Sequence, residues 1–388
     1  MTPLQPTLEL LDRLIAFPTV SKSSNLEMIH CIKDYLTNSD VRVTVLPNAA
    51  GDKAALFASV GPDVPGGVVL SGHSDVVPTD GQDWSSDPWH LRADNDRLYG
   101  RGTCDMKGFC ASVLARMVTL NSDDLQRPIH MALSYDEEIG CLGVAPLIDH
   151  MRKTNIRPEA VIVGEPSSME VVHAHKGTWS LLTRVKGHEV HSSICHKGVS
   201  AVMVAARLVT WLEDQMIANA EQAASMSAEP DFDPPYTTLH VGRIKGGTSG
   251  NITAGYCSFP TDIRVLPNED MAQWYDRYIT FVQETEAKMR EIHSDTSISV
   301  QVMARVAGLA VEDPGAAEAL VQDLTGGCRS HMAGIGSEAG LFQEAGFSTV
   351  ICGPGSIGQA HQPDEYVSKV QLGQCDRFMQ DLGLKLSA

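Results

Sequence analysis

The stretch LSGHSDVVPTD, residues 70–80, presents a histidine and an aspartate two positions apart, directly after an apolar run. In an extended segment, residues i and i+2 lie on the same face, so His73 and Asp75 share one side of the chain. A carboxylate in that place can accept the second N–H of a metal-binding imidazole and raise its basicity. The pattern therefore predicts that His73 binds a metal and that Asp75 orients it.

Further acidic and histidine side chains follow other apolar runs or glycine-rich turns. Taken singly, each pattern is also typical of a solvated turn or an exposed strand end, and only their joint occurrence after separate strands favours a site. The candidates are Glu137 and Glu138 in MALSYDEEIG, Glu165 in VIVGEP, His361 in VICGPGSIGQAHQPDE and Asp105 in YGRGTCDMKGF.

So many carboxylates in one pocket repel one another unless a cation offsets them. Two imidazoles with several carboxylates suit zinc, cobalt or manganese better than calcium, which prefers oxygen ligands alone. With one shared carboxylate, the set can hold two metals about 3.5–4 Å apart. The neighbours Glu137 and Glu138 cannot point the same way, so one can bind metal while the other acts as a general base.

Cys104 stands next to Asp105 and is a candidate ligand or nucleophile. No base is placed beside it by the sequence, so we interpret it as a small side chain that fills space beside the site.

The elements that position these residues alternate between strand and helix in the first part of the chain. Near-continuous apolar strands separated by helices predict an α/β sheet with helices on both faces. We expect helices at 7–15, 25–37, 108–120 and 141–153 and strands at 41–47, 54–60, 66–75, 129–138 and 160–166, and the pattern resumes after about 305 with a helix at 315–324 and a strand at 347–355.

From about residue 178 the pattern changes to alternating, half-exposed strands with two long amphipathic helices. The order strand, helix, two strands, helix, strand predicts a small α+β sandwich with both helices on one face of an antiparallel sheet. We therefore expect an inserted domain at 178–305 and a catalytic domain made of 1–177 and 306–388, and the inserted elements are strands at 178–191, 237–247, 257–267 and 297–306 and helices at 200–220 and 272–292.

The composition limits the class of protein. A formal net charge of −18 over 388 residues opposes binding to nucleic acid or to anionic membranes. The first residues lack the basic and apolar regions of a signal peptide, and no apolar run reaches the roughly 18–20 residues that a membrane span needs. Nine cysteines without a regular framework favour reduced thiols. We expect a cytoplasmic protein whose partners include neither nucleic acid nor a membrane.

At these residues the sequence resembles the M20 family of metallopeptidases and deacylases. The likeness rests on an ordered series of motifs from about residue 69 to 366, namely SGHSDVVP, LYGRGTCDMKGF, SYDEEIGCLG, VGEPS, HSS, GGTSGNI, DIR and GPGSIGQAHQPDEY. Such a series is far more specific than any one motif. The resemblance implies a zinc-exopeptidase-like catalytic domain with a mixed, mainly parallel sheet and an inserted ferredoxin-like domain that serves as lid and dimer interface.

The resemblance also implies a role for each matching residue. One zinc ion would be bound by His73, Asp105 and Glu165, and a second by Asp105, Glu138 and His361, with Asp105 as the bridge. Asp75 would support His73, and Glu137 would be the general base and proton shuttle. His191 would polarise the scissile carbonyl, in the same subunit or across a homodimer, although an exposed strand histidine would look the same in sequence.

Within the family the likeness is greatest to the acetylornithine deacetylases. It implies a dizinc amidohydrolase that removes acetate from an Nα-acyl amino acid such as N-acetylornithine, with Co²⁺ or Mn²⁺ as substitutes for zinc. A deacylase of another N-acyl amino acid, a dipeptidase or carboxypeptidase of the same chemistry, and a metal-binding scaffold without activity are the alternatives. The implied substrate contacts are Asn251, Arg264, Ser337, Glu338, which would face a distal ammonium group, and Gly355.

Overall fold

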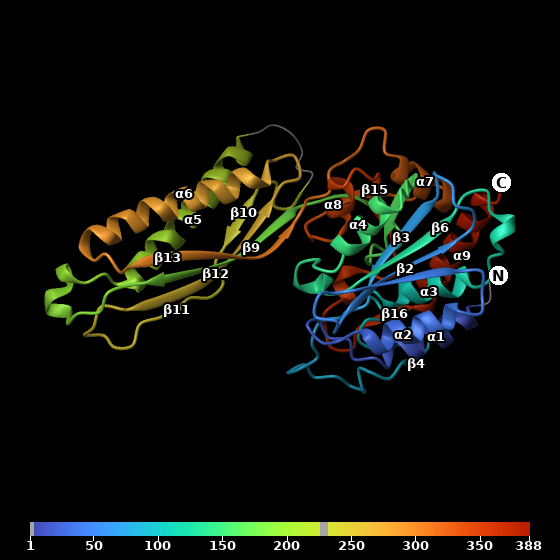
Figure 1. Cartoon of the computed structure of the whole chain (residues 1–388), viewed down its shortest axis with the longest axis horizontal. Coiled ribbons are helices and arrows are strands. Elements are labelled where there is room, and N and C mark those ends of the chain that lie inside the picture. Colours follow the sequence, from blue (N-terminus) through green and yellow to red (C-terminus); the bar gives the residue numbers. More distant parts are fainter. Residues whose placement is uncertain (1–3, 226–231) are drawn as a thin grey trace. The chain divides into compact units, whose positions relative to one another are not determined.

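The computed structural model describes residues 4–225 and 232–388 and divides the chain into two compact units (Figure 1). The first, which we call the catalytic unit, comprises 1–174, 309–332 and 337–388. The second, the insert unit, comprises 175–308 and also 333–336, a short piece outside the range 178–305 expected from the sequence. Each unit has its own cluster of buried apolar side chains.

The catalytic unit is built on a sheet of eight strands, of which four at the centre run parallel. The antiparallel pairs lie toward the edges, at β1–β2, β2–β6 and β15–β8. The α/β class with a mixed, mainly parallel sheet is thereby confirmed. In spatial order the strands are β1 (Arg42–Pro47), β2 (Ala54–Val60), β6 (Ile129–Ser134), β3 (Val68–His73), β7 (Ala160–Val163), β15 (Thr349–Ile351), β8 (Val171–His175) and β14 (Ser330–Ala333).

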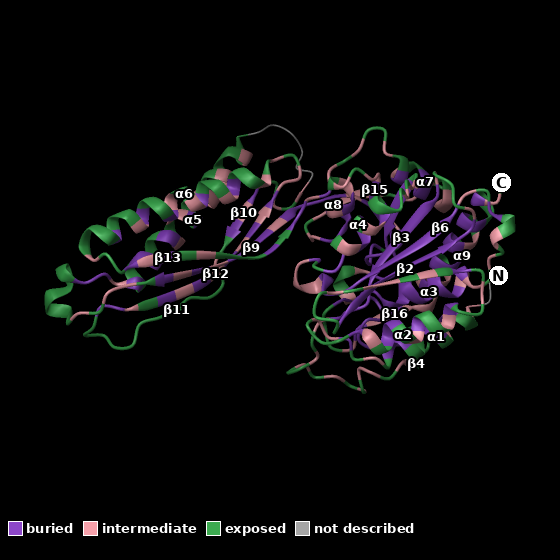
Figure 2. Cartoon of the chain, in the orientation of Figure 1, coloured by how far each residue is buried: buried purple, intermediate pink, exposed green. Residues whose placement is uncertain are grey.

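Every residue of β2, β3, β6 and β7 is buried, so both faces of these strands are covered (Figure 2). Helix α3 packs on β3 and β6 and is itself covered by α1 and α9, while α4 packs on β2 and β6, and α7 and α8 pack on β7 and β15. The helices are α1 (Gln5–Ile15), α2 (Leu26–Leu36), α3 (Lys107–Met117), α4 (Ala145–Lys153), α7 (Ala316–Thr325), α8 (Ala339–Glu344) and α9 (Lys369–Leu386).

A small three-stranded sheet and several 3₁₀ turns complete the catalytic unit. In the small sheet β5 pairs with both β4 and β16, so it joins a segment before Asp105 to a segment after His361. The elements are β4 (Arg92–Asp94), β5 (Arg97–Tyr99), β16 (Tyr366–Ser368), η1 (Ser122–Asp124), η2 (Glu137–Ile139) and η4 (Ile357–Gln359).

The insert unit is an antiparallel sheet with two long helices, and its two central strands alternate between buried and half-exposed residues. The buried faces of α5 and α6 and the inward residues of β9 and β12 form one core. The elements are β9 (Gly177–Lys186), η3 (Ser192–Lys197), α5 (Ala201–Ala224), β10 (Thr238–His240), β11 (Lys245–Gly246), β12 (Tyr256–Val265), α6 (Met271–Ile292) and β13 (Ser297–Val306).

The strand expected at 237–247 is instead two short strands, β10 and β11, which both pair with β12. Pro260 of β12 lies opposite the gap between them, and proline has no N–H to donate to a neighbouring strand. A continuous ladder is therefore not available at this point.

None of the helices in the described ranges combines the length and apolarity that crossing a membrane requires.

Candidate active site

Three parallel strands bring the first group of side chains together. The strands β6, β3 and β7 are neighbours in register, with His73 opposite Ser134 and Ser71 opposite Val163. Their carboxyl ends therefore lie at one edge of the sheet, where loops can present polar groups. His73 ends β3, Glu137 and Glu138 follow β6, and Glu165 follows β7.

Two loops supply the remaining members of the cluster. Asp105 lies just before α3, and the carboxylate is 5% exposed. His361 follows the turn η4 and has a φ of 63°, a left-handed conformation that non-glycine residues adopt rarely and that is concentrated at functional sites. Its side chain remains 47% exposed, so the site is open to solvent on this side.

The Asp105 carboxylate lies between the two imidazoles. His73 Nε2 is 3.0 Å from Asp105 Oδ1, and His361 Nε2 is 3.2 Å from Asp105 Oδ2. His361 Nε2 is also 3.0 Å from Glu138 Oε2, and His73 Nε2 is 3.9 Å from Glu165 Oε1. Each oxygen of Asp105 thus faces a different histidine, which is the arrangement required of a carboxylate shared by two metal ions.

The orientation of His73 differs in one respect from the sequence expectation. His73 Nδ1 makes its hydrogen bond with the main-chain carbonyl of Asp75, at 2.8 Å, whereas the Asp75 carboxylate is 3.6 Å away. That carboxylate accepts hydrogen bonds from the Ser21 hydroxyl at 2.6 Å and from the Glu137 N–H at 3.0 Å. Asp75 therefore has two roles. Its side chain holds the loop that carries Glu137, and its main-chain carbonyl orients the imidazole of His73.

Glu137 is a buried carboxylate at the start of the turn η2. Burial, reinforced by the negative charge of Glu138 and opposed in part by His73, raises the pKa of Glu137 to about 8. Its Oε1 accepts a hydrogen bond from the Cys141 thiol at 3.2 Å. A carboxyl group whose pKa lies near neutrality can both take up and release a proton, as a general base and acid must.

The electrostatics of the cluster favour a cation. Burial and the neighbouring carboxylates Asp105 and Glu137 raise the pKa of Glu165, and burial with Asp105 raises that of Glu138. Burial alone would also raise the pKa of Asp105, but hydrogen bonds from His361 and His73 hold it below its usual range.

The donor atoms fit a transition metal. Atoms of His73, Asp105 and Glu138 lie within 4.8 Å of one another, and so do atoms of His73, Glu137 and Glu165. The mixed nitrogen and oxygen donors suit zinc, cobalt or manganese. Burial is the main cause of the raised pKa values of Glu137, Glu138 and Glu165, and a bound divalent cation would offset the mutual repulsion that adds to it.

Cys104 and Gly355 lie against each other beside this cluster. Gly355 has a φ of 89°, and a Cβ atom there would come within 2.4 Å of the Cys104 sulfur. Burial, with the charges of Glu365 and Asp105, raises the pKa of the Cys104 thiol, so it is not an activated nucleophile. The structure thus places Gly355 where no side chain fits, and Cys104 fills the space beside it.

Glu338 lies differently from the expected contact with a substrate ammonium group. It is fully buried, and its two carboxylate oxygens accept hydrogen bonds from Ser71 at 2.6 Å and Ser134 at 2.8 Å. These serines belong to β3 and β6, so Glu338 fastens the ends of the strands that precede His73 and Glu137. The adjacent Ser337 is also fully buried, and its hydroxyl accepts a hydrogen bond from the Ala339 N–H at the start of α8.

The other expected substrate residues belong to the insert unit. His191 is exposed and precedes the turn η3, and its Nδ1 lies 2.8 Å from the Ser193 hydroxyl. Asn251 is exposed, and its side chain accepts a hydrogen bond from Ser249. Arg264 is half-buried on β12 and bonds Asp262 at 3.0 Å and Thr178 at 3.1 Å.

Comparisons with known proteins identify the family of this chain. Residues 69–385 match the model of peptidase family M20/M25/M40. The chain belongs to the M20 family. It is 32% identical to an acetylornithine deacetylase of Pasteurella multocida, with 93% of each chain covered, and 31% identical to an acetylornithine deacetylase of Pectobacterium atrosepticum, with 94% and 93% covered.

Solved structures share the fold of this M20 protein. An M20 family metallo-carboxypeptidase of Sulfolobus solfataricus superposes with a TM-score of 0.77 at 16% identity, covering 98% of this chain and 99% of the other. The aminopeptidase PepT of Bacillus cereus gives a TM-score of 0.73 at 18% identity, with 99% of each chain covered. The M20 protein is thus a metal-dependent hydrolase that cleaves amide bonds.

Sequence reasoning missed residues that support the ligands of this M20 site rather than join them. Glu365 and Arg101 form a fully buried ion pair at 2.6 Å, and Gln82 hydrogen-bonds the main-chain carbonyl of His361 at 2.8 Å. Glu365 and Arg101 stand in the motifs QPDEY and YGRGTCD, so their presence in motifs was the available signal. The sequence did not predict that they are buried, because charged side chains are usually exposed.

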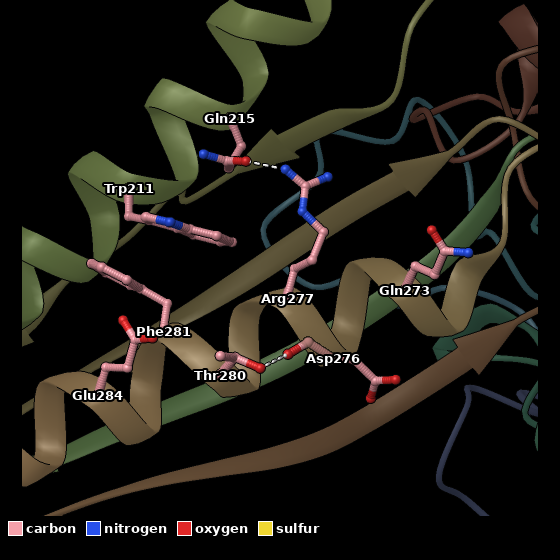
Figure 3. A pocket seen from close by; sticks show the side chains of 8 residues that line it. All are labelled: Trp211, Gln215, Gln273, Asp276, Arg277, Thr280, Phe281 and Glu284. Atoms are coloured by element: carbon pink, nitrogen blue, oxygen red, sulfur yellow. Dashed lines mark hydrogen bonds between the residues drawn. The ribbon is translucent and has the colours of Figure 1, made fainter.

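The insert unit of the M20 protein also carries an open groove of about 540 Å³ between α5 and α6 (Figure 3). Trp211 and Phe281 stack at 5.1 Å, and Arg277 hydrogen-bonds Gln215 across the two helices. The described residues that line it include the carboxylates Asp276 and Glu284 but no histidine, so the groove lacks the mixed nitrogen and oxygen donors of the cluster in the catalytic unit.

Proposed function

We propose that this M20 protein is a dizinc amidohydrolase that converts N-acetylornithine and water into ornithine and acetate. The observation that carries the proposal is the position of Asp105, whose two oxygens face His73 and His361 beside the buried Glu137. The choice of substrate is supported by the two acetylornithine deacetylases, because the match to this chain covers 93% of the length of each.

The metal centre would be held by five side chains. His73, Asp105 and Glu165 would bind one zinc ion, and Asp105, Glu138 and His361 the other, with Co²⁺ or Mn²⁺ as substitutes. When bound, the metals supply Lewis acidity that polarises the amide carbonyl and lowers the pKa of water.

The protein's own groups would move the proton. Glu137 takes a proton from the attacking water and delivers it to the leaving amine nitrogen, so the C–N bond breaks as the amine becomes neutral. Asp75 holds the Glu137 loop through its hydrogen bond to the Glu137 N–H. The exposed His191 would donate a hydrogen bond to the carbonyl oxygen as it becomes an oxyanion.

Four further residues would contact or surround the substrate. Arg264 would hold the α-carboxylate of the substrate by paired hydrogen bonds, a geometry suited to guanidinium, and Asn251 would contribute a further polar contact. Gly355 and Ser337 would shape the floor of the pocket, since the first admits no side chain and the second is fully buried. Glu338, which we expected to face a distal ammonium group, would act indirectly, because its fully buried carboxylate is bonded to Ser71 and Ser134.

We further propose a cytoplasmic homodimer that pairs through the insert unit and serves arginine biosynthesis. The edge strand β13 supports pairing, because its exposed side chains include Val302, 43% exposed, and Met303, 48% exposed. An edge strand that exposes apolar side chains favours association with another chain.

A hydrolysis screen tests the proposed activity. The zinc-loaded protein is assayed against N-acetyl, N-formyl and N-succinyl derivatives of ornithine and other amino acids, with release of the free amine as the signal. We expect the highest kcat/KM for N-acetylornithine. A preference for N-succinyl or N-formyl substrates, or for another amino acid, would replace the substrate while leaving the hydrolase class intact.

A dipeptidase or carboxypeptidase is the second candidate. Solved structures of the same fold include a human carnosine dipeptidase and the metallo-carboxypeptidase already described. Adding dipeptides and N-blocked peptides to the same screen distinguishes these activities from deacetylation. Hydrolysis of none of these compounds by metal-loaded protein would favour a metal-binding scaffold, which the buried Glu137 beside the ligands argues against.

A further inference from the structure

Two loops that carry metal ligands are joined through one carboxylate. Glu365 lies four residues after His361, and its side chain is fully buried. Its Oε1 accepts three main-chain N–H groups of the other loop, those of Gly102 at 3.1 Å, Cys104 at 2.9 Å and Asp105 at 3.0 Å. The loop that presents the bridging carboxylate is thus folded around the side chain of Glu365.

The second oxygen of Glu365 extends the connection back to His361. Its Oε2 pairs with Arg101 Nη1 at 2.6 Å, and Arg101 Nη2 donates to Gln82 Oε1 at 2.5 Å. Gln82 Nε2 then donates to the main-chain carbonyl of His361 at 2.8 Å. The hydrogen bonds form a closed circuit from the His361 loop to the Asp105 loop and back.

Main-chain bonds reinforce the same connection. The Gly100 N–H donates to the carbonyl of Glu365 at 3.0 Å, and Ser85 donates to the Asp364 carboxylate through both its N–H and its hydroxyl. A buried ion pair contributes little net stability by itself, because the removal of two charges from water opposes folding. Fixing one geometry is a better-supported use for such a pair.

We propose that Glu365 is a positioning residue, which sets the separation between Asp105 and His361 before any metal binds. This inference rests on the proposed metal centre for its consequence, which is affinity for zinc. Because Asp105 is the only one of the five proposed ligands assigned to both metals, a displacement of its loop would weaken both sites together.

The test compares E365Q with D376N. Asp376 is also a buried carboxylate that fastens two segments, since it accepts a hydrogen bond from Thr7 of α1 at 2.9 Å. In E365Q the amide oxygen can still accept N–H groups, but the pair with Arg101 is lost. Zinc affinity is measured by competition with a chromophoric chelator at a temperature where both variants are folded. We expect a loss of about 10- to 100-fold in E365Q and no change in D376N.

Amide hydrogen exchange of the metal-free proteins gives the second measurement. We expect faster exchange in E365Q at residues 102–105 and 357–364, with rates elsewhere as in the wild type. Unchanged exchange in these two segments, or zinc affinity lost equally in D376N, would overturn the proposal. If E365Q does not fold, Q82A breaks the circuit at a more exposed point, and the same two measurements apply.

The outcomes separate this inference from the proposed function. A wild-type protein that binds no divalent metal refutes the dizinc hydrolase, yet the exchange pattern still decides whether Glu365 joins the two loops. Conversely, a wild type that binds zinc and deacetylates, combined with E365Q of unchanged affinity and exchange, refutes the positioning role alone.

Discussion

Glu137 has the surroundings that a proton carrier requires. It is 9% exposed, so little bulk water competes for its proton, and burial raises its pKa to about 8. Its main-chain N–H is bonded by Asp75 and its side chain by the Cys141 thiol, so the carboxylate has a defined direction. The side chain of Glu138 is also buried, and its N–H also donates to Asp75. Its carboxylate, however, lies 3.0 Å from the imidazole of His361, whereas that of Glu137 accepts a hydrogen bond from the Cys141 thiol.

The substitution E137Q tests this distinction. The amide keeps the size of the side chain but can no longer accept the proton of water, so we expect kcat to fall by about 10²–10⁴-fold, the usual contribution of general acid–base catalysis. Zinc content, measured by atomic absorption, should stay at the wild-type level.

E138Q is the matched control because it makes the same carboxylate-to-amide change at the neighbouring residue. It should lower zinc content as well as kcat, since Glu138 is a proposed ligand. If E137Q loses zinc and E138Q keeps it, the roles of the two glutamates must be exchanged, an assignment that the proximity of Glu137 to His73 and Glu165 makes worth testing.

The sequence identifies which side chains meet more readily than how they are held. His73, Glu138 and Glu165 follow apolar strands, and parallel strands end at a common edge, so their convergence follows from local patterns. The use of the Asp75 carbonyl in place of its carboxylate, and the complete burial of Glu338, depend on side-chain packing between distant segments. No local pattern encodes such contacts.

At the scale of elements, long periodic segments were predictable and short ones were not. The strands β2 and β13 were expected with their observed bounds, and α5 and α6 within a few residues. The three-residue strands β4, β5 and β16 are too short to show a period of two, and they form only because they pair with one another. Local sequence patterns therefore predict the main sheet and helices of the catalytic unit. They do not predict the small sheet that joins the segments next to Asp105 and His361.

His130 on β6 makes the stability of the main sheet depend on pH. Its ring lies 2.7 Å from the Ser59 hydroxyl of β2, and burial, followed by the charges of Arg42 and His150, lowers its pKa to about 4. The unfolded chain takes up a proton near pH 6.5, whereas the folded chain does not until about pH 4. The neutral imidazole therefore contributes stability above pH 6.5 that is lost as the pH falls toward 4.

We expect H130Q to flatten the acid side of the stability profile. Between about pH 4.5 and 6, removal of one titrating group should reduce the slope of the unfolding free energy by up to about 1.4 kcal/mol per pH unit. Urea unfolding at a series of pH values measures this slope. The control H240Q replaces an exposed histidine of β10 and should leave it unchanged. A wild-type slope in H130Q would show that His130 does not resist protonation.

At the scale of the whole molecule, the chain leaves the catalytic unit after residue 174 and re-enters it at 309. The insert unit has its own core, which includes Leu181, Phe259 and Tyr278, so its fold does not depend on side chains of the catalytic unit for a hydrophobic interior. Glu137 belongs to the catalytic unit and His191 to the insert unit. In the proposed homodimer, the two residues that serve one active site can therefore come from different subunits.

Subunit mixing tests whether His191 acts across a dimer. E137Q disables the catalytic unit, and H191A disables the proposed carbonyl contact of the insert unit. If His191 serves the partner's site, a hybrid of the two variants contains one site with both groups intact. Random pairing makes about half of the dimers hybrid, and each has one working site of two. The mixture, unfolded and refolded together, should recover about a quarter of the wild-type activity, measured as amine release against each variant refolded alone.

If His191 acts within its own subunit, every site in every dimer lacks one group, so the mixture stays as inactive as its parents. Hybrid dimers purified with two affinity tags must be present in the inactive mixture for that result to exclude action across the dimer.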